Sequence, residues 1–155
     1  MRPLLIALLL TLCPGLRAGG VEFVRVWPGY RDSRSFERIS EFFTGREAPT
    51  KEVVQRTQPT SREGFYFLIR VANTSADLAH ASLRVTLIAP DSPYPRTYAF
   101  PVAVPLGQTV YNLGLTGKDW DRRKTHPVAW HVQLIADNGE VLTEKDSFLW
   151  EKPQP

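Results

Sequence analysis

Apolar and polar residues alternate along most of this chain, which predicts a protein built mainly from β-strands. In residues 64–72 the odd positions are Phe, Phe, Ile and Val, and the even positions carry Tyr, Leu and Arg. A two-residue period is typical of a strand with one face in the core, and we expect 64–72 to lie centrally in a sheet. Further strands are expected at 21–27, 52–57, 82–89, 98–104, 108–115, 128–136 and 141–150.

Prolines and glycines predict where some of these strands end or lie in the sheet. Local alternation predicts which side chains share a face. Pro28 and Gly29 are expected to end the strand at 21–27, and alternation there groups Arg25 with Phe23 on one side. Five prolines lie between residues 90 and 105. Because proline cannot donate a hydrogen bond to a neighbouring strand, we expect 98–104 to be an edge strand.

One segment has helical rather than strand spacing. Phe36, Ile39 and Phe43 recur at intervals of a helical face, after Asp32 and Ser33, which can cap a helix N-terminus. The pattern predicts one short helix at about 33–44. A helix of about three turns is not stable alone, so its Phe-bearing face would have to dock on a sheet.

The last two strands read as a hairpin. Asn138 and Gly139 suit a two-residue type I′ turn, which needs left-handed backbone angles. With these two residues as the loop, strict pairing places Ile135 opposite Leu142 and His131 opposite Asp146. The hairpin therefore makes a prediction about side-chain faces as well as about the turn.

The apolar residues of the two arms fall on opposite faces of this hairpin. Under strict pairing, Phe148 and Trp150 would point away from the core. A single inserted residue moves every later side chain to the opposite face. We therefore expect a β-bulge between Thr143 and Ser147 that returns Phe148 and Trp150 to the core.

These elements together predict an all-β fold. Short strands, frequent turns and a single short helix fit a two-sheet sandwich. Its architecture resembles immunoglobulin and fibronectin type III domains, a likeness of fold only, because the paired cysteines of a true immunoglobulin domain are absent. We expect one domain at 19–150 and a loose tail at 151–155.

The first residues have the order of a secretory signal peptide. Arg2 precedes an apolar run at 4–12, and Pro14 and Gly15 precede Ala18. The run is about half of the roughly 20 residues that a transmembrane helix needs, so no membrane anchor is expected. We interpret 1–18 as a signal peptide and expect a periplasmic or extracellular protein.

Cleavage after Ala18 changes the composition. Cys13 is the only cysteine, and it would leave together with Arg2 and Arg17, so 17 Lys and Arg would face 16 Asp and Glu. A nearly neutral domain gives no reason to expect nucleic-acid binding, which calls for a clustered basic face. Small secreted eukaryotic domains are disulfide-dense, so a thiol-free exported domain favours a bacterial source.

Few residues carry recognisable chemistry. His131 and Asp146 would form half of a hydrolytic site but have no nucleophile in an obvious place. His80 and His126 complete the set of histidines, and their spacing is not that of a metal site. No metal and no cofactor is therefore expected. Asn73 begins an N-glycosylation sequon, which would be used only in a eukaryotic source.

The loop around Trp120 is the candidate binding site. Trp120 lies among charged residues that include Arg122 and Arg123, and an exposed indole there could stack on a sugar or anchor a partner protein. Tyr94 and Tyr98 could extend this surface. In the alternative interpretation, Trp120 folds inward and closes the end of the sandwich.

Three functions are compatible with these features. The first is a non-enzymatic interaction or accessory module of the cell envelope, which binds a protein through the strand at 98–104 and the Trp120 loop. The second is a carbohydrate-binding module that uses exposed aromatic residues around Trp120. The third is a hydrolase with a His131 and Asp146 site.

The signal peptide generates the first testable prediction. We expect the secreted form to begin at Gly19, because the small residue Ala18 follows the apolar run and its breaker. The intact mass of the secreted protein measures this directly. A mass that retains Cys13 with a lipid attached would instead identify a lipoprotein.

Overall fold

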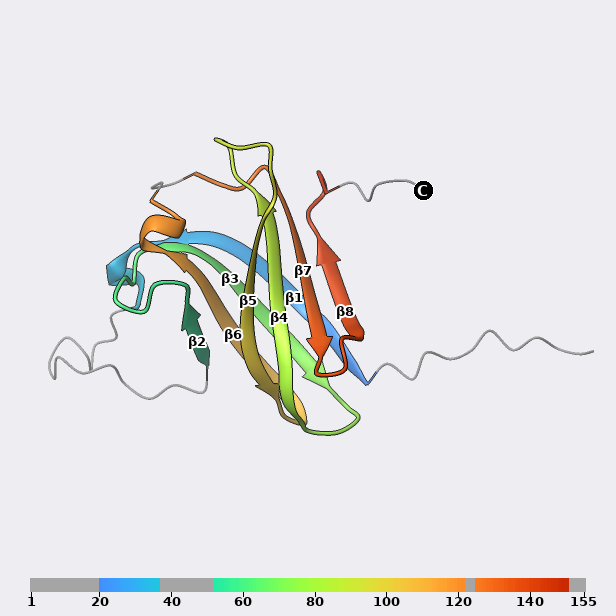
Figure 1. The fold of residues 1–155 in the computed structure, drawn as a ribbon. Coiled ribbons are helices and arrows are strands. Elements are labelled where there is room, and N and C mark those ends of the chain that lie inside the picture. Colours follow the sequence, from blue (N-terminus) through green and yellow to red (C-terminus); the bar gives the residue numbers. More distant parts are fainter. Residues whose placement is uncertain (1–19, 37–51, 122–124, 151–155) are drawn as a thin grey trace, which may run out of the picture.

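The protein is a sandwich of two four-stranded β-sheets. The computed structural model describes residues 20–36, 52–121 and 125–150. The sheets have strand orders β1-β3-β6-β2 and β5-β4-β7-β8, and Figure 1 shows the second sheet in front of the first. All neighbouring strands are antiparallel except β2 and β6, which are parallel. The strands are β1 (Val21–Arg31), β2 (Val53–Arg56), β3 (Gly64–Asn73), β4 (Leu78–Ile88), β5 (Arg96–Val104), β6 (Gly107–Thr116), β7 (Ala129–Ala136) and β8 (Val141–Asp146).

Most of the strands predicted from the sequence are confirmed, and so are their inward faces. β3 lies between β1 and β6, as expected of a central strand, and β5 is an edge strand. The odd positions of β3 are fully buried, and β4 buries alternate residues against them. The fully buried apolar residues of these two strands include Phe65, Phe67, Ile69, Val71, Leu83 and Val85.

Aromatic rings pack together in the core, and one pair joins the inner faces of the two sheets. The ring of Phe65 lies 5.0 Å from that of Trp120, and the ring of Phe67 lies 5.8 Å from that of Trp130 on β7 in an edge-to-face arrangement. Phe65 and Phe67 also contact each other at 5.5 Å. Such pairs add about 0.5–1.5 kcal/mol each beyond the burial of their surface.

The first strand is longer than predicted. Pro28 and Gly29 do not end it, and they pair with Phe67 and Tyr66 before β1 stops at Arg31. A proline is tolerated here because β1 is an edge strand with one unpaired side. A register shift between Phe23 and Arg25 marks a β-bulge in the same strand.

The helix predicted at about 33–44 is only partly within the described residues. Ser33–Phe36 forms a 3-10 turn, η1, rather than the start of an α-helix, and the rest of the predicted segment lies outside the described residues. Asp32 caps this turn, since the backbone N–H and the hydroxyl of Ser35 donate to its carboxylate at 2.8 and 2.7 Å. These hydrogen bonds lower the pKa of Asp32.

The C-terminal hairpin confirms one part of the prediction and corrects another. His131 pairs with Asp146 as expected, but Ile135 pairs with Val141 and not with Leu142. The backbone N–H of Ala136 donates to the carbonyl of Glu140 at 2.8 Å, so the loop has one residue more than a type I′ turn.

The bulge predicted between Thr143 and Ser147 is wrong. The register shift lies next to the turn instead, and pairing then continues without interruption from Thr143 to Asp146. The strand ends at Asp146, and Phe148 is 99% exposed rather than returned to the core. The shift beside the turn cancels the extra loop residue and restores the pairing of His131 with Asp146, and no later shift turns the last residues inward.

Two glycines in sheet β1-β3-β6-β2 make a matched prediction about stability. A Cβ at Gly64 would lie 2.1 Å from the carbonyl oxygen of Leu115, a backbone atom of the neighbouring strand, whereas one at Gly29 would meet nothing within 4 Å. We expect Gly64→Ala to destabilise the fold by about 1–3 kcal/mol and Gly29→Ala to have little effect. Urea unfolding measures both, and equal midpoints for the two variants would contradict the packing described here.

Candidate functional site

Trp120 takes the inward position. It follows the short 3-10 turn η2 (Gly117–Asp119), and its side chain is 4% exposed and packed against Phe65. His126 touches the same phenylalanine ring at 5.5 Å. Trp120 therefore closes one end of the core, and its indole is not an exposed binding platform.

Of the other residues predicted around Trp120, the two tyrosines differ in exposure. Tyr94 is 77% exposed in the loop between β4 and β5, whereas Tyr98 is partly buried against the core. Burial, and after it the charge of Asp119, raises the pKa of Tyr98. Arg122 and Arg123 lie outside the described residues. The predicted aromatic surface is thus reduced to Tyr94.

A small polar pocket lies beside Trp120. It has a volume of about 170 Å³, and Arg96 and Asp91 form an ion pair of 3.3 Å in its wall. Gln58 donates to Asp119, another wall residue, at 2.9 Å. Three of its charged side chains already have partners, and the pocket is small, so it offers little to a ligand.

In the edge strand predicted as a contact surface, two backbone carbonyls are already hydrogen-bonded to side chains. In β5, Pro101 lacks an N–H, and its carbonyl accepts a hydrogen bond of 2.6 Å from the Gln55 amide. The next outward carbonyl, that of Ala103, accepts from the Tyr111 hydroxyl. Side chains of the opposite sheet thus occupy backbone groups that an added strand would need.

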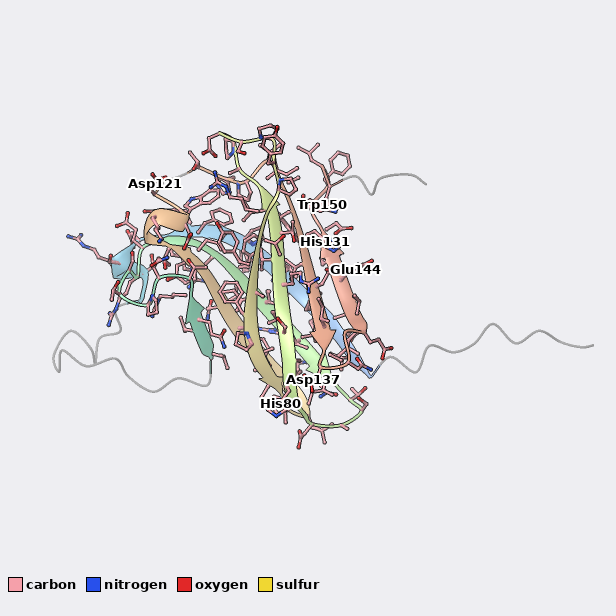
Figure 2. All side chains as sticks on the ribbon, viewed as in Figure 1. His80, Asp121, His131, Asp137, Glu144 and Trp150 are labelled. Atoms are coloured by element: carbon pink, nitrogen blue, oxygen red, sulfur yellow. The ribbon has the colours of Figure 1, made fainter. Side chains whose placement is uncertain are left out.

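An open groove of about 750 Å³ crosses this edge. Its walls are mostly small or apolar residues, and its polar groups come from Gln55, His80, Ser82 and Asp137. Figure 2 shows His80 and Asp137 near each other at the end of the sandwich. No hydrogen bond joins these four side chains to one another in the described structure, so the groove lacks a converging polar site.

His131 and Asp146 are brought together, as the sequence predicts. Nδ1 of His131 donates a hydrogen bond to Asp146, and Nε2 lies 3.6 Å from a carboxylate oxygen of Glu144. The ring of Trp150 stacks on the imidazole at 5.3 Å and 16° (Figure 2). Gln133 donates to the same carboxylate of Glu144 at 3.2 Å.

This arrangement differs from that of a catalytic triad. A triad histidine keeps Nε2 beside the hydroxyl that it deprotonates. Here Nε2 faces Glu144 and the indole of Trp150 covers one face of the ring, so both ring nitrogens of His131 face carboxylates. The cluster is suited to hold Trp150 in place rather than to activate a nucleophile.

The sequence analysis missed an exposed apolar cluster at the end of sheet β5-β4-β7-β8. Val128, Phe148 and Leu149 are exposed, and they flank the paired ends of β7 and β8. Tyr94 belongs to the β4–β5 loop at the same end (Figure 1). We call these four residues the end cluster. The sequence did contain a signal for this cluster, because strict pairing of the hairpin places Phe148 on the face that points away from the core.

The residues that the structure describes contain neither a metal-ligand cluster nor a membrane-spanning helix. They contain no group of three His, Cys, Asp or Glu side chains able to hold a metal ion. Among them, no helix is long and apolar enough to cross a membrane. Asn73 is buried, and its amide donates to the carbonyls of Ala76 and Val104, so the sequon side chain is not free for glycosylation in this fold.

Comparison with known proteins leaves the chain without an assigned family. No protein-family model, no curated protein and no solved structure matches it. The function must therefore be argued from the residues of this chain alone.

The buried Tyr111 gives a prediction about alkaline pH. Burial raises the pKa of Tyr111 above the usual value of about 10. Its contribution to stability is thus fully present below about pH 10 and is lost as pH rises through the raised pKa. We expect Tyr111→Phe to lose about 1 kcal/mol at pH 7, with its hydrogen bond to Ala103, and to fall less steeply above pH 10. Urea unfolding at pH 8 and 11 checks this, and parallel losses in both proteins would contradict it.

Proposed function

We propose that this protein is an exported, non-enzymatic β-sandwich that binds another protein through the end cluster. The observation that carries the proposal is Phe148, which is 99% exposed beside the exposed Leu149. Single exposed apolar residues are ordinary, but several at one end of a sheet favour an interaction site. Tyr94 and Val128 enlarge the cluster at the same end of the sheet.

The turn that carries Phe148 is held by backbone hydrogen bonds. Ser147 donates its N–H to the carbonyl of Trp130 at 2.9 Å and accepts the N–H of Trp130 on its hydroxyl, also at 2.9 Å. The N–H of Trp150 then donates to the carbonyl of Ser147 at 3.1 Å. An apolar residue that is fixed before binding loses less conformational entropy in a complex.

The His131 cluster supports the same function. Trp150 ends the turn, and its ring is stacked on His131, which is itself hydrogen-bonded to Asp146 on β8. Phe148 and Leu149 are therefore tethered on both sides, at Ser147 and at Trp150. In this proposal His131 and Asp146 are positioning residues and have no catalytic role.

The strand connectivity supports the finer fold assignment. In chain order, β1, β3 and β6 occupy the positions of strands A, B and E of an immunoglobulin-like sandwich. The order β5-β4-β7-β8 corresponds to C′-C-F-G, and β2 takes the place of D beside β6, although it is parallel to β6. We propose an immunoglobulin-like or fibronectin type III-like module, a fold that often presents binding surfaces at its ends.

The compartment remains part of the proposal. Residues 1–18 support export, and a thiol-free domain supports the bacterial periplasm or cell surface. Carbohydrate binding around Trp120 is less well supported, because that indole lies in the core. A hydrolase is less well supported too, because Nε2 of His131 faces a carboxylate.

The test begins with a photo-reactive amino acid at position 148 in cells of the source organism. We expect it to cross-link one partner that the same group at position 106 does not capture, because Leu106 is an exposed leucine of the β5–β6 connection at the opposite end of the sandwich. The partner is then purified, and its binding to the secreted protein is measured by calorimetry.

The variants decide the outcome. Phe148→Ser should weaken binding about 30-fold or more, as expected for a residue that contributes about 2 kcal/mol to an interface. The matched variant Leu106→Ser should leave the affinity within about twofold of the original protein. Failure to cross-link at position 148, or an unchanged affinity of Phe148→Ser, would overturn the proposal.

A further inference from the structure

The outer face of β1 and β3 carries a second exposed surface, which is independent of the end cluster. Trp27 is 56% exposed, whereas Trp120 is buried and Trp130 and Trp150 pack on other rings. Because paired residues share a face, Trp27 lies beside Leu68, Arg25 beside Arg70, and Gly29 beside Tyr66. We call Arg25, Trp27, Gly29 and Arg70 the arginine–indole slot.

A bulge puts one of the arginines on this face. Alternation alone groups Arg25 with Phe23, whose partner Val71 is fully buried in the core. The register shift between Phe23 and Arg25 inserts Val24 and turns Arg25 outward, opposite Arg70. β-bulges often redirect a side chain in this way near functional sites.

The two guanidinium groups leave positive charge that the described residues do not neutralise. Arg25 and Arg70 are exposed and face each other across the strand pair, an arrangement that costs stability because the charges are alike. Glu22 lies one pair further along this face, opposite Ala72, and no ion pair joins it to either arginine. An anionic group held between the two arginines would remove the repulsion.

The Trp27 indole contacts Arg25 on one side and has open space on the other. The guanidinium carbon of Arg25 lies 4.3 Å from the centre of the Trp27 ring. Gly29 is the next residue outward along β1, and a Cβ added there would meet nothing within 4 Å. Tyr66, which pairs with Gly29, instead covers Gly114, where a Cβ would lie 2.4 Å from its ring. Open space therefore remains beside the indole.

We propose that the arginine–indole slot binds a uronate residue of an acidic polysaccharide. The carboxylate of one sugar would lie between Arg25 and Arg70, and the ring of a neighbouring sugar in the same polymer would pack against Trp27 above Gly29. Aromatic rings and guanidinium groups are suited to these two parts of the ligand. The slot and the end cluster are on different sheets, so this proposal does not depend on the partner of Phe148.

Other anionic ligands fit these features less well. An acidic peptide offers carboxylates, but its acidic side chains have no flat ring to pack beside the indole. A nucleic acid carries a phosphate at every residue and is bound by an extended basic surface, whereas this face has two arginines. We therefore assign the slot to an acidic sugar and make the other ligands outcomes of the test.

The test is a titration of the secreted protein with a galacturonate hexamer at low salt, followed by calorimetry. We expect saturable binding that weakens with added salt, and at least tenfold weaker binding of the neutral galactose counterpart. Equal or tighter binding of polyglutamate or of a short single-stranded DNA would overturn the proposal, and so would the absence of hexamer binding.

Three variants distinguish binding at the arginine–indole slot from nonspecific attraction to positive charge. Gly29→Leu fills the open space without changing charge, and Arg70→Gln removes one guanidinium, so each should weaken hexamer binding at least tenfold. Arg84→Gln removes an exposed arginine from the other sheet and should leave binding within twofold. Unfolding midpoints confirm that the variants are folded. Unchanged binding by Gly29→Leu, or an equal loss in Arg84→Gln, would refute the assignment.

Discussion

Burial of apolar side chains between the two sheets holds this sandwich together, and aromatic ring contacts are part of that core. The only cysteine of the chain, Cys13, precedes the domain, so no disulfide can join the sheets. Phe65 and Phe67 on β3 instead meet Trp120 and Trp130, at 5.0 and 5.8 Å. The Phe67–Trp130 pair lies between β3 and β7, inner strands of the two sheets. The inward position of Trp120 follows from this need, because it fills the end of a core with no covalent support.

Because aromatic residues fill the core of this sandwich, the aromatic residues that remain outside it are candidates for binding a partner. Phe148 and Trp27 could each contribute burial energy to the fold but remain largely exposed. The turn backbone that carries Phe148 is held by the hydrogen bonds of Ser147, and the indole of Trp27 is in contact with the guanidinium of Arg25. The two surfaces belong to different sheets and differ in character, since one is apolar and the other cationic. A module with two such surfaces could join a protein to an acidic polymer.

The sequence predicted the parts of the fold that depend on local pattern. The two-residue period of 64–72 and 82–89 placed the core faces of β3 and β4, because side-chain direction alternates in every strand. Prolines placed β5 at an edge, because they remove a donor wherever the strand lies. The binding surfaces were not predicted in this way. The charged neighbours of Trp120 are compatible with an exposed or an inward indole, and its packing against Phe65 decides for the inward position.

What the sequence determined by itself was the set of strands, their alternation and the absence of thiols after Cys13. The tertiary structure decided where one extra residue is inserted. In β1 the bulge after Phe23 turns Arg25 out beside Trp27, and in the last hairpin the shift lies beside the turn rather than before Phe148, which stays in solvent. A period of two fixes only relative faces, and a one-residue shift exchanges them. That shift is set by pairing between distant strands, which the local pattern does not contain.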